Sequence, residues 1–243
     1  MPIRLLLITM ALVMTLSCTP RAALQDDPVA DAPDQATCCT LVLIKTGSMS
    51  GKLSEADNGK AFAGHFENMS RLANARQLLI AGPYGEQRHD PQLRGLFVLA
   101  TADRAEAERW ASTDPTTIAG VFTLEFHALA TEAPLLAALD RYLADAEKQK
   151  AEGTEEKPGD KMRSYVLLTA DDGIRTEREL AALKHRAGGV FLLGRLDGNR
   201  AFAILDAEAA DVAKTRFAQP LANIGTYTLD DWYASKQIES LVD

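Results

Sequence analysis

The pattern of apolar and polar positions in residues 40–131 predicts one compact unit of strands and helices. Segments with an apolar residue at every second position read as strands, and segments with a 3.6-residue period read as helices. The order is strand, helix, strand, strand, helix, strand over about 90 residues, which is the ferredoxin-like arrangement of an antiparallel sheet with helices on one face. The expected segments are Thr40–Lys45, Asn58–Asn74, Gln77–Ala81, Gly95–Ala100, Asp103–Ser112 (capped by Asp103) and Val121–Ala128.

The same pattern occurs a second time. Gly95–Gly120 matches Arg200–Gly225: a Phe and a Pro lie 18 residues apart in both, and a Gly follows the Pro after 5 residues in both. Upstream, Gly82 is aligned with Gly194, and a tight Asp197-Gly198 turn replaces the longer loop of the first copy. The chain is therefore expected to be an α+β protein with two tandem ferredoxin-like units.

Between the copies, a helical run is followed by a segment rich in Glu, Lys, Gly and Pro, which is typical of a solvated linker or an exposed helix end. The expected division of the chain is a signal peptide at 1–17, a lipid attachment site and flexible tether at 18–39, a first unit at 40–131, a helical and charged linker at 132–162, a second unit at 163–234 and a tail at 235–243.

The first unit, from Leu41 to about Thr131, resembles the YCII-related (YciI-like) family of small dimeric α/β-barrel proteins. The residues that carry the resemblance are His65, Ala81-Gly82-Pro83, Gly95-Leu-Phe97, Asp114-Pro115 and Gly120. The resemblance implies a ferredoxin-like fold and sheet-to-sheet packing of two units, here as a fused dimeric α/β barrel. It also implies a catalytic His-Asp dyad, which falls on His65 and Asp114. The second unit resembles the family only in its framework, because Glu177 and Gln219 stand at the corresponding positions.

Each dyad residue also has a purely structural interpretation. Ser-Thr-Asp114-Pro is typical of a helix N-cap followed by proline at the first helical position, and a histidine on a helix is often a surface residue. A histidine held by a carboxylate is nevertheless a suitable general acid/base, since imidazole titrates near neutrality and the carboxylate selects its tautomer. An active dyad requires the two side chains to lie about 2.6 to 3.2 Å apart or one water apart.

Four further residues are candidates for substrate binding. Gly82 and Pro83 read first as a turn at the end of a strand, and second as backbone exposed beside a pocket. Glu125 and His127 share one face of their strand, which faces either the barrel interior or an exposed edge. The two other histidines that follow the first helix, His89 and His185, are given no role.

The first seventeen residues read as a signal peptide. A positive start at Arg4 precedes a twelve-residue apolar run, Leu5–Leu16, which is too short to span a bilayer. Ser17-Cys18 then resembles a bacterial lipobox, although Thr15 departs from its usual leucine. We expect lipidation at Cys18, an anchor on the periplasmic side of the cell envelope, and the outer membrane in preference to the inner one.

Cys38 and Cys39 leave two interpretations open. Their adjacent Cα atoms would lie about 3.8 Å apart, below the usual disulfide span of about 4.4 to 6.8 Å. They are therefore either small apolar residues that open a strand, or thiols for intermolecular or redox pairing.

Composition limits the possible partners. The formal net charge is −8, and no basic stripe is present, so nucleic acid is an unfavourable partner. The sequence contains no glycine-rich phosphate loop, no metal-binding spacing of His or Cys, and no nucleophile elbow, so it implies no cofactor and no metal. The expected partners are an unidentified small molecule and, through the lipid, the membrane. The two units are expected to form an intramolecular pseudo-dimer, which leaves higher oligomers open.

Two functions are consistent with these features. The first is an enzyme of unspecified reaction that acts on a small molecule with a His65-Asp114 acid/base dyad. The second is a non-catalytic ligand-binding or scaffold lipoprotein of the envelope.

Overall fold

The computed structural model describes residues 37–155, 157–184 and 188–242. The expected signal peptide, Cys18 and His185 lie outside these residues. The first half contains β1 (Thr37–Thr46), α1 (Glu55–Asn74), β2 (Leu78–Pro83), β3 (Leu93–Leu99), α2 (Arg104–Ala111), α3 (Pro115–Ile118), β4 (Phe122–Thr131) and α4 (Leu135–Glu152). The second half contains η1 (Pro158–Lys161), β5 (Met162–Ala170), α5 (Gly173–Leu180), η2 (Ala181–Leu183), β6 (Val190–Leu196), β7 (Arg200–Leu205), α6 (Ala210–Arg216), α7 (Ala218–Leu221), β8 (Tyr227–Ser235) and η3 (Lys236–Leu241).

The eight strands form one antiparallel sheet in the order β2-β3-β1-β4-β6-β7-β5-β8. Each half contributes four strands in the ferredoxin-like order, and β4 pairs with β6 to join the halves. The two outer strands also meet: Tyr84 and Trp232 form a bridge, and the backbone N–H of Gly85 donates to the carbonyl of Asp231 at 2.7 Å. The sheet is therefore nearly closed, and the predicted α+β fold of two ferredoxin-like units packed as a fused dimeric α/β barrel is confirmed.

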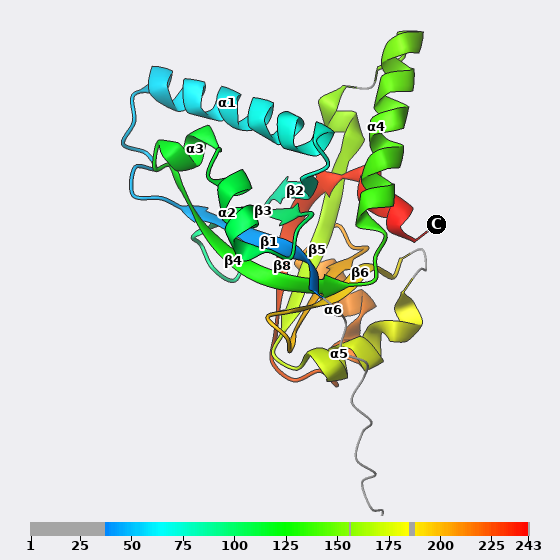
Figure 1. Cartoon of the computed structure of the whole chain (residues 1–243). Coiled ribbons are helices and arrows are strands. Elements are labelled where there is room, and N and C mark those ends of the chain that lie inside the picture. The colour runs from blue at the N-terminus through cyan, green and yellow to red at the C-terminus, as the bar shows by residue number, and fades with distance from the viewer. Residues whose placement is uncertain (1–36, 156, 185–187, 243) are drawn as a thin grey trace, which may run out of the picture. The chain divides into compact units, whose positions relative to one another are not determined.

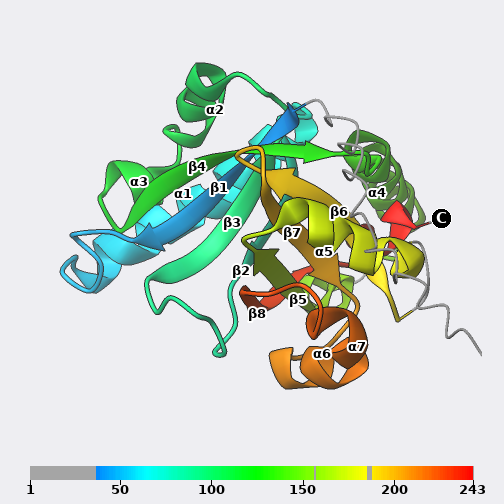
Figure 2. The ribbon, with the colours of Figure 1, turned by 90° about the horizontal axis from the view of Figure 1, so that it is seen from below.

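Three apolar clusters fill this architecture. The inner cluster lies within the nearly closed sheet and contains Tyr165, Trp232 and Leu129. One outer cluster lies between the first four strands and α1 and α2, and the other lies between the last four strands and α5, α6 and α7. Figures 1 and 2 show the helices of the two halves on opposite outer sides of the sheet.

The element boundaries differ from the expected ones mainly at the strand ends. β1 begins at Thr37, three residues before the expected strand, and so includes both Cys38 and Cys39. α4 is more than a solvated linker, because Leu135, Ala138 and Leu139 on its first turns are buried in the inner cluster beside η3. Farther along, α4 carries exposed polar residues and ends at Gly153, which has a positive φ of 66°.

The sequence repeat corresponds to a structural repeat, but the predicted alignment of the two copies contains one error. Gly120 and Gly225 occupy corresponding turns and both have positive φ, 70° and 76°, a conformation that favours glycine. Strand pairing places Ala81 opposite Phe97, whereas Gly194 lies opposite Phe202. Since Phe97 and Phe202 correspond, Gly194 corresponds to Ala81, and the alignment of Gly82 with Gly194 is wrong by one residue. The connection from β2 to β3 is longer than that from β6 to β7, so counting residues back from Phe97 and Phe202 does not fix this alignment.

Candidate active site

His65 lies on the inner face of α1. The helix begins at Ser54, whose hydroxyl accepts the backbone N–H of Asp57. Phe62 and His65, three residues apart, share the helix face toward the sheet, and the ring of Phe66, which is 62% exposed, has its centroid 5.3 Å from that of His65. His65 itself is only 8% exposed. The α1 helix thus places an imidazole among aromatic side chains at the edge of the core.

Asp114 caps α3 and contacts His65 at the same time. Its Oδ1 accepts the backbone N–H of Thr116 at 2.9 Å and also the Thr116 hydroxyl, while Pro115 occupies the first turn of the helix. Its Oδ2 lies 2.6 Å from Nδ1 of His65. The capping role and the contact with His65 therefore use different oxygens, and neither excludes the other.

A glycine permits this approach of the two helices. A Cβ atom on Gly64 would lie 2.9 Å from Cγ of Pro115, so a larger residue would push α1 and α3 apart. Gly64 immediately precedes His65 on α1, and Pro115 immediately follows Asp114. The packing of Gly64 against Pro115 thus sets the distance between His65 and Asp114.

The electrostatics of the pair favour an ionised carboxylate. Asp114 is 2% exposed, and burial alone would raise its pKa, but hydrogen bonds from His65 and Thr116 outweigh burial and lower the pKa of Asp114. An ionised Asp114 accepts the proton on Nδ1 of His65, which leaves Nε2 as the second functional nitrogen. Nε2 makes no hydrogen bond to any residue that the structure describes.

A cavity of about 170 Å³ lies beside His65. Aromatic rings dominate its wall, and the Phe97 ring is stacked on His65 with the ring centroids 6.0 Å apart and the planes at 19°. Arg94 and His65 are the ionisable residues of the lining. The lining residues are Ile44, Phe62, His65, Phe66, Met69, Gly82, Pro83, Arg94, Gly95, Phe97 and Phe122.

Gly82 and Pro83 line the same cavity as His65, although neither forms a turn. They are the last two residues of β2, so their interpretation as a turn is wrong. Nε1 of Trp232 donates to the carbonyl of Gly82 at 2.9 Å, and a Cβ atom at Gly82 would lie 2.3 Å from the carbonyl oxygen of Tyr233. Gly82 therefore allows β2 and β8 to approach closely where the sheet closes.

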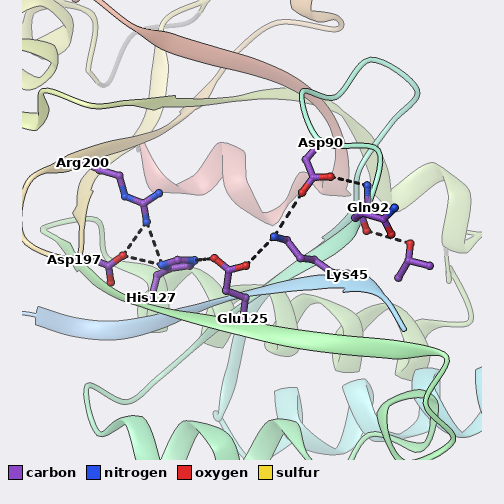
Figure 3. Close-up of polar contacts among 8 residues, drawn as sticks. Lys45, Asp90, Gln92, Glu125, His127, Asp197 and Arg200 are labelled. Atoms are coloured by element: carbon purple, nitrogen blue, oxygen red, sulfur yellow. Dashed lines mark hydrogen bonds and ion pairs between the residues drawn. The ribbon is translucent and has the colours of Figure 1, made fainter. Parts of the chain in front are cut away.

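Glu125 and His127 are not among the residues that line this cavity. They lie on the face of β4 that points away from the helices, in a chain of polar contacts that Figure 3 shows. Oε2 of Glu125 lies 2.7 Å from Nζ of Lys45, and Oε1 lies 2.9 Å from Nε2 of His127. Nδ1 of His127 lies 2.7 Å from Oδ2 of Asp197, a residue of the second half.

Acidic and basic side chains alternate along this chain of contacts, which joins the two halves. Arg200 continues it beyond Asp197 at 2.8 Å, and Asp90 continues it beyond Lys45 at 3.5 Å. For Asp197, burial opposes ionisation, but hydrogen bonds from His127 and Arg200 lower its pKa. The arrangement occupies both ring nitrogens of His127, so it differs from the His65 site, where Nε2 is left for a ligand.

In the second half, Glu177 and Gln219, the residues that the sequence alignment matched to the dyad, make other contacts. Oε1 of Glu177 on α5 lies 3.3 Å from Nε of Arg195 on β6, and both side chains are largely buried. Gln219 is an exposed residue inside α7 and does not cap it as Asp114 caps α3. The His-Asp pair and its aromatic pocket thus belong to the first half.

The sequence did not indicate a second His-Asp contact. Nδ1 of His89, in the loop between β2 and β3, lies 2.8 Å from Oδ2 of Asp230 on β8, and the His89 backbone N–H donates to the same carboxylate at 2.6 Å. No local pattern links residues 141 positions apart. The aromatic pocket could have been found, since Phe62, Phe66 and Met69 recur around His65 at helical spacing.

Among the described residues, no group of three or more His, Cys, Asp or Glu side chains is placed to hold a metal ion. In the same part of the chain, no helix is both long enough and apolar enough to cross a membrane.

The fold and the site together define a class: a fused dimeric α/β barrel in which one of the two units has a His-Asp pair beside a pocket. Residues 41–125 match the YCII-related domain, which confirms the resemblance predicted for the first unit. No curated protein matches the chain. A solved structure described as that of an anthrone oxidase-like protein is 11% identical, with 83% of this chain and 92% of that chain covered. Its TM-score is 0.37, so this similarity carries no argument about function.

Proposed function

We propose that the first unit is a small-molecule enzyme in which His65 acts as general acid/base and Asp114 positions it. The observation that supports this most directly is the 2.6 Å contact between Nδ1 of His65 and Oδ2 of Asp114 at the wall of a 170 Å³ cavity. Both residues are buried, so the pair is shielded from water and its geometry is held by packing. A YCII-related domain at residues 41–125 is consistent with a small-molecule site there.

In this proposal each polar atom of the pair has a role. Asp114 accepts the proton on Nδ1, which selects the tautomer with a lone pair on Nε2. Nε2 removes a proton from a ligand in the cavity, and Asp114 stabilises the imidazolium that forms. Nε2 then returns the proton to the product. General acid/base catalysis of this kind contributes about 10² to 10⁴ in rate.

The cavity restricts what can bind. A volume of about 170 Å³ holds only a small molecule, and the rings of Phe62, Phe66, Phe97 and Phe122 make the site largely apolar. The tight packing of Gly82 against β8 fixes one wall of the cavity. A ligand would therefore present an apolar body to these rings and an acidic proton to His65.

The alternative is a ligand-binding or scaffold protein without catalysis. One observation favours it: the second half keeps the fold although Glu177 pairs with Arg195 and Gln219 does not cap α7, so the architecture does not need the dyad. Under this alternative His65 binds a ligand, and no bond of the ligand changes.

A metabolite screen on the full chain separates the two proposals. Wild type, His65→Ala and His89→Ala are compared for ligand-induced stabilisation and for turnover of the same compounds. His89→Ala is the matched control, because it also removes a histidine that contacts an aspartate, but outside the cavity. The enzyme proposal expects turnover in wild type and His89→Ala and a loss of at least 10² in His65→Ala. Binding without turnover in wild type would support the alternative, and undiminished turnover in His65→Ala would refute the dyad.

We propose further that the protein is an envelope lipoprotein anchored through Cys18, on the periplasmic side and more consistent with the outer membrane than the inner. This rests on the apolar run and lipobox-like end of residues 1–18 and, for the outer membrane, on Thr19 in place of Asp after Cys18. Cys18→Ser should move the protein from the membrane fraction to the soluble fraction of cells, and unchanged fractionation would refute lipidation.

The internal closure of the sheet supports a monomer as the working unit. The two halves already pair β4 with β6 and bring β2 against β8, so neither half leaves these edges for a second copy. Sedimentation of the protein without its lipid should show a monomer, and a homodimer at micromolar concentration would contradict this proposal.

A further inference from the structure

Cys38 and Cys39 begin β1, and neither lines the His65 cavity. In a regular strand, neighbouring side chains point to opposite faces, so the sulfurs of adjacent cysteines would lie well apart. Pairing with β4 is irregular here: Thr37 lies opposite Ala130, and Cys39 lies opposite Leu129. Cys38 is thus the extra residue of a β-bulge, a feature that redirects a side chain. The result is a distance of 3.1 Å between the two Sγ atoms.

The two sulfurs have unequal surroundings. Cys39 is 4% exposed in the inner cluster, whereas Cys38 is exposed. A negative charge is better hydrated on Cys38, so the Cys39 thiol acts as donor and the Cys38 thiolate as acceptor. This hydrogen bond, opposed by partial burial, lowers the pKa of Cys38 to about 6. The same contact, together with burial, raises the pKa of Cys39.

Groups on the neighbouring elements do not compete strongly for the Cys38 sulfur. When protonated, the Cys38 thiol can donate to the carbonyls of Leu129 and Thr131 on β4, which lie 3.8 and 3.5 Å away, but these carbonyls have no proton to donate to the thiolate. Glu132, which follows β4, has a side chain 72% exposed and pairs with Lys184 at 3.6 Å. The Cys39 thiol is therefore the main partner of the Cys38 thiolate.

We propose that Cys38 is a site of reversible S-thiolation by low-molecular-weight disulfides and that Cys39 is its positioning residue. The Cys38 thiolate attacks one sulfur of the disulfide, and a new S–S bond forms as the original one breaks. The departing half leaves with the electron pair as a thiolate and takes a proton from water. The Cys38 sulfur is oxidised and the departing half is reduced, so no other oxidant is needed.

The geometry also predicts that this mixed disulfide persists. Attack by Cys39 on the modified Cys38 would require a bond between neighbours whose Cα atoms lie about 3.8 Å apart, below the usual span of about 4.4 to 6.8 Å. The raised pKa of Cys39 keeps it a thiol, which is a poor nucleophile. The stable product is therefore the mixed disulfide at Cys38, and an external thiol is required to reverse it.

The experiment follows the reaction of the full chain with oxidised glutathione between pH 5 and 9 by intact mass. Peptide fragmentation assigns each adduct, so that Cys18 is scored separately. The variants are Cys38→Ser, and Cys39→Ala, which removes the donor without substituting a hydroxyl. We expect one glutathionyl group on Cys38, none there in Cys38→Ser, and a rate midpoint near pH 6 in wild type that moves to about 8.5 in Cys39→Ala.

The difference in reaction rate between wild type and Cys39→Ala is largest at low pH. At pH 5.5 a thiol with a pKa of about 6 is roughly a quarter ionised, against about 0.1% for an unperturbed thiol. The more acidic thiolate is intrinsically a weaker nucleophile, which offsets about tenfold of this advantage in ionised fraction. At pH 5.5, Cys38 should therefore react roughly 20-fold more slowly in Cys39→Ala than in wild type. Absence of an adduct on Cys38, a wild-type midpoint above pH 8, or a Cys38–Cys39 disulfide as the main product would each overturn the proposal. If Cys39→Ala does not fold, the pH dependence of the wild-type reaction rate tests the proposal by itself.

Discussion

Replacing Asp114 by alanine removes two hydrogen-bonding functions at once, and their magnitudes can be separated. Oδ1 caps α3 through the backbone N–H of Thr116, and losing such a cap costs about 1 kcal/mol. Oδ2 accepts a hydrogen bond from His65, and a bond to a charged group contributes about 1.5 to 3 kcal/mol. Since Asp114 is 2% exposed, solvent screens this contact little. We expect Asp114→Ala to lower the free energy of unfolding by about 3 kcal/mol.

Asp103 supplies the matched control. It caps α2 by accepting the backbone N–H groups of Ala105 and Glu106, and it contacts no histidine in the described part of the chain. Asp103→Ala should therefore cost about 1 kcal/mol. The assay is urea unfolding at pH 7, followed by tryptophan fluorescence and far-UV circular dichroism, with coincident transitions as the test of two-state behaviour.

The pH dependence provides an independent check. Burial opposes ionisation, but hydrogen bonds from His65 and Thr116 hold the pKa of Asp114 below its unfolded value of about 3.9. A carboxyl group with a depressed pKa contributes stability above the unfolded pKa, and this contribution is lost as the pH falls through the folded pKa. The difference between wild type and Asp114→Ala should thus shrink below about pH 4. Equal losses in Asp114→Ala and Asp103→Ala at pH 7 would refute the reasoning.

Three further predictions concern the packing and the contact between the halves. The side chain added in Gly59→Ala on α1 meets open space, so the free energy of unfolding should rise by about 1 kcal/mol through helix propensity. The side chain added in Gly64→Ala meets Pro115, so no rise is expected. Equal rises for the two variants in urea unfolding would contradict the α1–α3 packing. Trp232→Phe removes the N–H that donates to a β2 carbonyl and also part of a fully buried ring system, so by the same assay it should cost more than about 1 kcal/mol, the contribution of the hydrogen bond alone. No loss would show that this contact does not help close the sheet. Asp197→Asn should lower the free energy of unfolding at pH 7, and this loss relative to wild type should vanish as the pH falls below about 4, because Asp197 is then protonated. A loss that persisted in acid would exclude ionisation of Asp197 as its source.

The sequence predicted the elements and their order because periodicity and repetition are local or nearly local properties. The apolar alternation of β4 and the helical spacing of α1 can be read without a partner strand. The matching glycines at 120 and 225, both with positive φ, show that the repeat reported real turns. Closure of the sheet was implied by the family resemblance, and the residues that make it, such as Trp232, carry no local mark of that role.

The details that escaped prediction depend on register and on long-range contact. The connections from β2 to β3 and from β6 to β7 differ in length, so only the strand pairing shows that Gly194 corresponds to Ala81 and not to Gly82. The double role of Asp114 was also hidden, because a capping sequence says nothing about the direction of the second carboxylate oxygen. The contact of His127 with Asp197 joins residues 70 positions apart and follows only from the pairing of the two halves.

The tautomer of His65 tests the central proposal most directly, because a base at Nε2 requires the proton on Nδ1. Long-range ¹H–¹⁵N correlation spectra of the imidazoles, assigned by comparison with His65→Ala, report which nitrogen carries the proton in the neutral ring. We predict Nδ1–H and an unprotonated Nε2 in wild type, and the opposite tautomer in Asp114→Asn, where the amide can donate to Nδ1. A neutral His65 protonated on Nε2 in wild type would contradict its role as the base.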